Sequence, residues 1–265
     1  MKKTTSDSKP KNIDQYIKWL KTKNTIVGNA TKKQYKTTVR DLKDQFETSK
    51  FWKTFSENLS NYNTEYKKET GYYLLTNNEI PKVENKEFSP FLLKTFRINI
   101  LKNPNFPEAP EGGWILKENW YSKINDTIRT MCMVKYIDGV IYLCNKIESL
   151  CDQCNTECEI SYEAKDEGYY AAHITIIQKY EIQNYDNDWG SKLIEVPIEI
   201  QITTQLQEVI KNLLHKHYEV RRKNINQESN WKWDYTSDEF KTNYLGHILH
   251  YLEGMIIEIR EKEGE

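Results

Sequence analysis

Strict alternation of apolar and polar residues marks one segment of the chain as a β-strand with two unlike faces. Every second position from residue 194 is apolar, and the row consists of Ile194, Val196, Ile198, Ile200 and Ile202. Successive side chains of a strand point to opposite faces of a sheet, so this row is expected to face a core. The opposite row contains Glu199, and a carboxylate on so apolar a strand needs a specific reason to be there.

Hydrophobic spacing elsewhere predicts helices at both ends of the chain and alternating strands and helices between them. Helical spacing covers residues 13–75 in segments, 91–103, 138–150, 204–222 and 237–262, and strand patterns cover 129–136, 158–164 and 171–182. Residues 77–90 and the Pro- and Gly-rich stretch 104–113 are expected to be loops. In the last helix the core-facing stripe is expected to be Leu245, Ile248, Leu249, Leu252, Ile256 and Ile259.

This order of elements predicts an α+β fold, with a central mixed, largely antiparallel sheet flanked by helices. The chain is expected to comprise a helical extension over residues 1–90, a mixed core over 91–225 and a C-terminal helix over 226–265 that packs on the core, all within one compact domain. The length of 265 residues is ample to bury such a core.

The amino-acid composition excludes only a few classes of function. Charged residues make up 29% of the chain, yet the net charge is −1, so basic stretches such as "HKHYEVRRK" matter only locally. Without an apolar run of about 20 residues, or an apolar segment behind the N-terminal lysines, we expect a cytoplasmic protein with no membrane contact. An odd number of cysteines, five, fits a reducing compartment.

Three of the cysteines form a C-x2-C-x3-C motif, namely Cys151, Cys154 and Cys158. A zinc site needs a fourth ligand, and the sequence places none nearby, so free thiols are the favoured interpretation and a metal stays open. P-loop, dinucleotide-binding, zinc-protease and nucleophile-elbow motifs are all missing, as is a His-Asp dipeptide of metal-dependent phosphohydrolases.

Two segments could still carry chemistry, and together they are more informative than either alone. "EGYYAAH" leads a predicted strand, and "EIQITT", with Glu199 first, closes the next one about 25 residues later. This combination resembles the synthetase domain of the RelA/SpoT family, as does "INDTIRTMCMVKYIDGV" upstream, over about residues 90–220. "KTFRINIL", "EGGWILKENW" and the C-terminal tail are similar to the toxic small alarmone synthetases, the toxins of toxin–antitoxin pairs. The resemblance implies a nucleotidyltransferase-like fold with a pyrophosphokinase core, and a cognate antitoxin that no residue here identifies.

The resemblance also implies roles for residues around the donor, ATP. Mg²⁺ would be held by Asp126 and Glu199, with Glu199 also taking the hydroxyl proton and Gln201 orienting the site. In the family the Asp commonly precedes the Arg by five residues, whereas here the gap is three. Lys94 and Arg97 would grip the ATP phosphates, and Arg129 would stack on or pair with the donor nucleotide.

Two departures from the family pattern concern the acceptor. Tyr170 and Thr203 stand where enzymes that accept guanosine nucleotides carry arginines, so two cations suited to the phosphates of GDP or GTP are missing. Tyr169 would instead stack on the acceptor base, and the other acceptor-binding candidates are Tyr170, His173, Lys211, Lys216, Arg221 and Arg222. Tyrosines are also ordinary strand formers, and a strand histidine is often only a hydrogen-bonded one.

The resulting first hypothesis is an ATP-dependent enzyme that pyrophosphorylates the 3′-hydroxyl of the tRNA CCA end, which blocks aminoacylation and inhibits translation. The alternative is a small alarmone synthetase that makes (p)ppGpp or (pp)pApp. A third hypothesis is a catalytically silent nucleotide- or RNA-binding module on the same fold. The missing His-Asp dipeptide predicts that the chain has no alarmone hydrolase activity, and the oligomeric state stays open.

Overall fold

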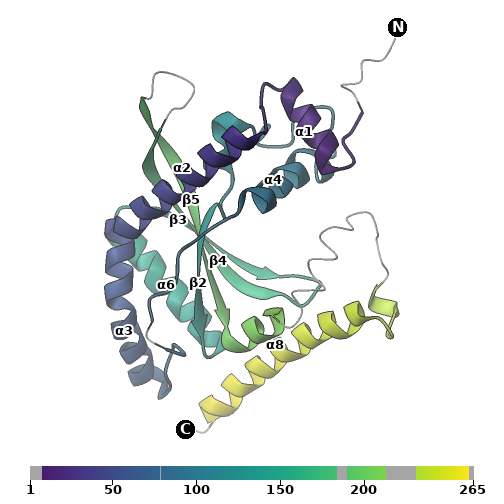
Figure 1. The fold of residues 1–265 in the computed structure, drawn as a ribbon. Coiled ribbons are helices and arrows are strands. Elements are labelled where there is room, and N and C mark those ends of the chain that lie inside the picture. The colour runs from purple at the N-terminus through teal and green to yellow at the C-terminus, as the bar shows by residue number, and fades with distance from the viewer. Residues whose placement is uncertain (1–7, 78, 184–189, 213–230, 263–265) are drawn as a thin grey trace. The chain divides into compact units, whose positions relative to one another are not determined.

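The computed structural model describes residues 8–77, 79–183, 190–212 and 231–262 (Figure 1). The predicted helical N-terminal region is confirmed, because three helices lie in it: α1 (Ile13–Thr22), α2 (Asn29–Thr48) and α3 (Lys50–Thr70). Next come a two-residue strand, β1 (Glu84–Asn85), helix α4 (Phe88–Phe96) and a π-helical turn over Arg97–Leu101.

The remaining elements alternate largely as predicted. They are a 3-10 turn (Lys117–Asn119), α5 (Trp120–Lys123), β2 (Ile128–Val134), α6 (Ile137–Gln153), β3 (Glu157–Ala164), β4 (Tyr170–Gln183), β5 (Ser191–Thr204), a helix described over 205–212, a second 3-10 turn (Trp231–Trp233) and α8 (Asp238–Lys262). The strands form one five-stranded sheet in the order β1-β2-β5-β4-β3, with β1 antiparallel to β2. The predicted α+β class, a sheet with helices around it, is confirmed.

The chain folds into two compact units, and each combines segments from distant parts of the sequence. The first unit contains Met1–Ser49, Val83–Arg129 and Ile177–Glu199, and the second contains Lys50–Lys82, Thr130–Ile176 and Ile200–Glu265. The domain boundaries expected near residues 90 and 225 stay predictions. No helix among the described residues is long and apolar enough to cross a membrane.

The core of the first unit is an aromatic cluster shared by α1, α2 and α4. Tyr16, Tyr35 and Phe91 are all at most 1% exposed in it. Polar groups inside the cluster are paired, since Tyr16 Oη donates to Thr95 Oγ1 at 3.0 Å and accepts from Asn99 Nδ2 at 2.8 Å. The π-helical turn that holds Asn99 is therefore tied to α1 by a buried hydrogen-bond chain.

Two sequence predictions need correction. Residues up to Pro90 were expected to be a loop, but α4 begins at Phe88, because a proline in a first helical turn removes only an N–H that has no acceptor within the helix. The apolar stripe of α8 was expected to face the core and instead faces outward, with Ile248 53% and Ile259 55% exposed. Helical spacing shows which residues share a face, but it does not show which face packs against the protein.

Candidate functional site

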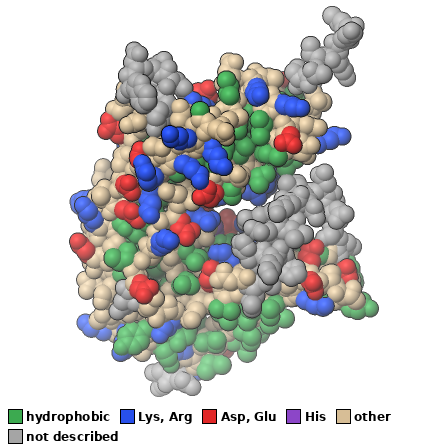
Figure 2. All heavy atoms as spheres, in the orientation of Figure 1, with side chains coloured by type: hydrophobic (Ala, Val, Ile, Leu, Met, Phe, Trp, Pro, Cys, Tyr) green, Lys and Arg blue, Asp and Glu red, His purple; other side chains and the backbone are tan. Residues whose placement is uncertain are grey.

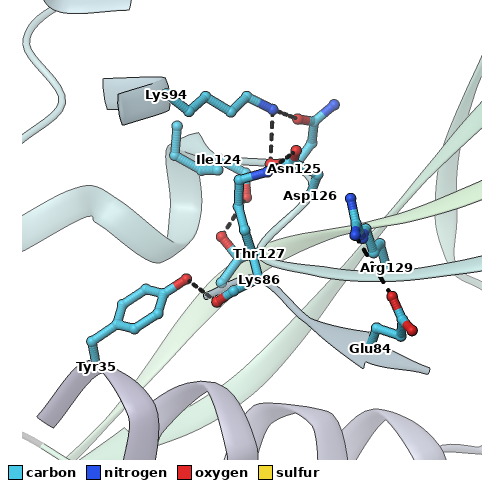
Figure 3. A network of polar contacts seen from close by, with 9 residues as sticks. All are labelled: Tyr35, Glu84, Lys86, Lys94, Ile124, Asn125, Asp126, Thr127 and Arg129. Atoms are coloured by element: carbon cyan, nitrogen blue, oxygen red, sulfur yellow. Dashed lines mark hydrogen bonds and ion pairs between the residues drawn. The ribbon is translucent and has the colours of Figure 1, made fainter. Parts of the chain in front are cut away.

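Two lysines of the first unit converge on one aspartate (Figure 3). Lys86 Nζ lies 2.7 Å from Asp126 Oδ2, and Lys94 Nζ lies 2.8 Å from Asp126 Oδ1. Each carboxylate oxygen thus has its own ammonium group. We call these three residues the lysine–aspartate cluster.

Three elements position the cluster. Lys86 directly follows β1, and its backbone is fixed by an N–H donated to Thr127 O at 2.9 Å and a carbonyl that accepts from Tyr35 Oη at 2.9 Å. Lys94 projects from α4 and also donates to Asn125 Oδ1 at 2.9 Å. The loop that precedes β2 therefore supplies the acceptors, and the lysines arrive from a strand end and from a helix.

The lysine–aspartate cluster contains more positive than negative charge. The side chains of Lys86, Asp126 and Lys94 are 12%, 14% and 20% exposed, so water screens their charges only weakly. Burial lowers the pKa of Lys86. Burial alone would raise the pKa of Asp126, but the ammonium groups of Lys94 and Lys86 outweigh it and hold that pKa below its ordinary value. With two cations and one anion, the cluster carries an excess positive charge suited to an anionic ligand.

The same geometry does not fit Asp126 as a ligand for Mg²⁺. A metal ligand offers a free carboxylate lone pair, whereas both oxygens of Asp126 are paired with ammonium groups. Among the described residues, no group of three or more His, Cys, Asp or Glu side chains could hold a metal ion. The metal role of Asp126 stays a prediction without structural support.

Arg97 and Arg129 were expected to join Lys94 around the donor nucleotide. Arg97 begins the π-helical turn directly after α4, and such turns occur often at functional sites. Arg129 lies opposite Glu84 in the pairing of β1 with β2, and its guanidinium is 3.6 Å from the Glu84 carboxylate. Both side chains of this pair are about half exposed, so a stronger anion could replace Glu84 at little cost.

On β5 the predicted two-faced strand is confirmed. Val196, Ile198, Ile200 and Ile202 are all 0% exposed. Glu199, on the opposite row, is only 5% exposed. A buried carboxylate is costly unless polar partners or a ligand compensate it, which keeps Glu199 the first candidate for a chemical role.

The acceptor candidates of the second unit form a group of their own. Tyr169 and His173 share a hydrogen bond of 3.0 Å between Tyr169 Oη and His173 Nε2. Tyr170 is hydrogen-bonded to His247 Nδ1 at 2.7 Å and stacks on the His250 ring with a centroid distance of 3.6 Å. Thr203, 5% exposed, donates to the backbone O of Tyr170 at 3.3 Å. Both residues that replace the expected arginines therefore have partners within the protein.

The remaining candidates are less informative. Gln201 is half-buried on β5, and Lys211 is paired with Glu208 at 3.0 Å on the helix over 205–212. Lys216, Arg221 and Arg222 lie outside the described residues. Within the C-x2-C-x3-C motif, Cys151 is fully buried and all three thiols are free.

Sequence analysis missed Lys86, His247 and His250. Lys86 follows a strand of only two residues, too short to leave an alternating pattern. His247 and His250 lie on the face of α8 opposite its apolar stripe, so apolar spacing does not pick them out. The only available signal was their spacing of three, which places both rings on one helical face.

The chain has the fold of the RelA/SpoT-type synthetases, as comparison with solved structures shows. It is similar to small alarmone synthetase 1 from Bacillus subtilis bound to its product pppGpp, with 16% identity, a TM-score of 0.52 and coverage of 84% of this chain and 99% of that one. A GTP pyrophosphokinase family protein from Streptococcus pneumoniae is similar at 16% identity and a TM-score of 0.50, with 87% and 91% of the two chains covered. The sequence itself matches no protein-family model and no curated protein.

Proposed function

We propose that the protein is an ATP-dependent pyrophosphokinase. The observation that carries the proposal is the lysine–aspartate cluster, a partly buried pair of lysines with excess positive charge in a fold found in alarmone synthetases. Polyphosphate oxygens are stronger partners for two ammonium groups than one shared carboxylate. Lys86 therefore joins Lys94, Arg97 and Arg129 as a candidate for binding the ATP phosphates.

The proposed reaction moves pyrophosphate as one unit. The acceptor 3′-hydroxyl oxygen attacks the β-phosphorus of ATP, the bond from that phosphorus to the α,β-bridging oxygen breaks, and AMP leaves. Glu199, a buried carboxylate on the polar row of β5, takes the hydroxyl proton. The lysines hold the phosphates in line for attack and balance their charge.

For the acceptor we propose the 3′ end of tRNA. Tyr170 and Thr203 are neutral, and both are engaged within the protein, so neither position offers a cation to the 5′ phosphates of a guanosine nucleotide. The terminal adenosine of tRNA has a diester at its 5′ side and needs a stacking surface rather than two arginines. Tyr169 provides such a ring, and a cognate antitoxin would then be the expected partner.

A basic hollow on α2 adds support for an RNA acceptor. It has a volume of about 320 Å³ and is lined by Asn29, Lys32, Lys33, Lys36, Thr37 and Arg40. Figure 2 shows blue side chains gathered over this helix. Several cations along one helix suit the successive phosphates of a polynucleotide better than a single nucleotide.

A second candidate function is alarmone synthesis with GDP, GTP or an adenosine nucleotide as acceptor. It is favoured by the structural neighbours, since small alarmone synthetase 1 from Bacillus subtilis is bound to pppGpp as its product. The donor chemistry would be the same, so only the acceptor separates the two functions.

The test supplies ATP labelled in its β- and γ-phosphates together with deacylated tRNA, GDP, GTP or AMP. We expect label in tRNA, and we expect periodate oxidation of the tRNA 3′ end to prevent the transfer. Label in a mononucleotide alone would overturn the tRNA proposal but keep the pyrophosphokinase. Absence of transfer to all four acceptors would overturn both.

The matched variant for this assay is Glu199→Gln, which keeps the shape of the side chain but removes the base. We expect transfer to fall about 100-fold or more. Glu195→Gln is the control, because Glu195 lies on the same face of β5 but is exposed and pairs only loosely with Lys179 at 3.8 Å. Equal activity of the two variants would contradict the role of Glu199.

A further inference from the structure

Helix α8 is amphipathic in the reverse of the usual sense, with a polar face toward the second unit and an apolar face toward solvent. Its buried positions are Asn243, Gly246 and Glu253, and no large apolar side chain is among them. Water-soluble helices normally bury the apolar face and expose the polar one. The reversal therefore needs a cause, either a loosely placed helix or a missing partner.

The inner face rules out a loosely placed helix, because specific contacts hold it along its length. Near its start, the backbones of Gly246 and Gly168 touch, and a Cβ added to either glycine would lie 2.3 Å from a backbone oxygen. Near its end, the Arg260 guanidinium lies against both the Tyr72 and the Tyr136 ring, at 5.1 and 5.0 Å from their centroids, and is paired with Asp138. Rotation of α8 about its axis would break all of these contacts.

The outer face carries a heptad row. Leu245, Ile248, Leu252, Met255 and Ile259 follow one another at intervals of three and four, which are the a and d positions of a coiled coil. These five side chains are 38–55% exposed, and Tyr244, Tyr251 and Ile256 widen the row. Figure 2 shows hydrophobic side chains along the lower edge of the view, where Figure 1 places α8. An a/d row of this kind is the contact surface for another helix that runs alongside it.

We propose that α8 pairs antiparallel with α8 of a second copy of this chain, around a two-fold axis near Leu252. The exposed side chains of the row, widened by Tyr244, Tyr251 and Ile256, present an apolar area on the order of several hundred Å², which approaches the roughly 800 Å² per partner of a stable interface. A second copy presents an identical row, as a two-fold interface requires. Antiparallel pairing also sets the two helix dipoles in opposite directions, which is their favourable arrangement.

Sedimentation velocity of the full chain at micromolar concentration tests this pairing. We expect a dimer for the wild type, and a monomer with an unchanged circular-dichroism spectrum for Ile248→Glu and Leu252→Glu. The matched control is Ile141→Glu on α6, because Ile141 and Ile248 are both 53% exposed isoleucines within helices of the second unit. This control is expected to remain a dimer.

A charge-pair experiment tests the antiparallel direction. Around an axis near Leu252, position 245 of one copy faces position 259 of the other. We expect Leu245→Lys alone and Ile259→Glu alone to dissociate at least tenfold more readily than wild type, and an equimolar mixture of the two to recover a dimer. A wild-type chain that stays monomeric at 100-fold higher concentration, or that dimerises unaffected by Ile248→Glu and Leu252→Glu, would overturn the proposal, as would binding of α8 only to another protein.

Discussion

The lysine–aspartate cluster, which is partly buried, and the inner face of α8 are both polar, but they differ in how their charges are balanced. Around Asp126 two cations share one anion. On the inner face of α8, Arg260 is paired one to one with the carboxylate of Asp138, and Glu253 Oε2 accepts a hydrogen bond from Gln207 Nε2 at 3.1 Å. The balanced surface holds a helix in place, whereas the unbalanced cluster is suited to take up an anion.

Removal of one lysine should have the largest effect, because it takes away the excess charge. We expect Lys86→Met to lower kcat/KM for ATP about 100-fold, which corresponds to about 2.7 kcal/mol, while Asp126 keeps Lys94 as its partner. The readout is steady-state transfer kinetics together with a thermal melt. Lys146→Met is the control, since Lys146 has an ion pair of the same length, 2.7 Å to Glu65, in the second unit. Equal losses of kcat/KM in both variants would show that the cluster behaves like an ordinary ion pair.

The glycine contact beneath α8 should give the next largest effect, on stability rather than on the ATP site. Gly246→Ala places a Cβ 2.3 Å from the backbone oxygen of Gly168, so we expect about 2 kcal/mol of lost stability. Gly254→Ala is the matched control, because no atom lies within 4 Å of its added Cβ and alanine favours the helix. Urea unfolding of both variants measures the difference. If Gly246→Ala were as stable as Gly254→Ala, the close packing of α8 would be wrong.

Replacement of Glu253 is expected to give a smaller change in stability, and a gain rather than a loss. Burial raises the pKa of its carboxyl, despite hydrogen bonds from Thr204 and Gln207 that lower it. A raised carboxyl pKa means that the folded state holds its proton more tightly than the unfolded one, so stability is lost as pH rises above the ordinary value near 4.5. We expect Glu253→Gln to gain up to about 1 kcal/mol at pH 7 and to lose this gain at pH 4. A pH-independent difference in urea unfolding would contradict this explanation.

The smallest expected effect is the response of α8 to mild acid. Burial, and then the neighbouring His247, lower the pKa of His250 below its ordinary 6.5. The unfolded state therefore takes up this proton first, and stability falls as pH drops below 6.5. His250→Phe keeps a ring to stack on Tyr170 but cannot be protonated, so its unfolding free energy should change less between pH 7 and pH 5.5. A steeper loss in the variant than in wild type would refute the assignment.

Part of the fold and of the candidate site could be predicted from the sequence, and the missing part has a physical reason. The alternation on β5 predicted its buried row and singled out Glu199, because strict alternation of apolar and polar residues fits a two-faced strand and few other structures. The apolar spacing of α8 defined its faces correctly, but an apolar stripe looks the same whether it covers the protein or a partner. The lysine–aspartate cluster joins residues up to 40 positions apart through a two-residue strand, and such long-range charge pairing leaves no local pattern.

The product formed from ATP tests the central claim most directly. With ATP labelled in its α-phosphate and tRNA as acceptor, the account predicts that labelled AMP appears in a one-to-one ratio with pyrophosphorylated tRNA. The rate at which labelled AMP forms should fall about 100-fold with Lys86→Met and with Glu199→Gln but not with Lys146→Met. Labelled ADP as the product, or ATP turnover with no change in any acceptor, would contradict it.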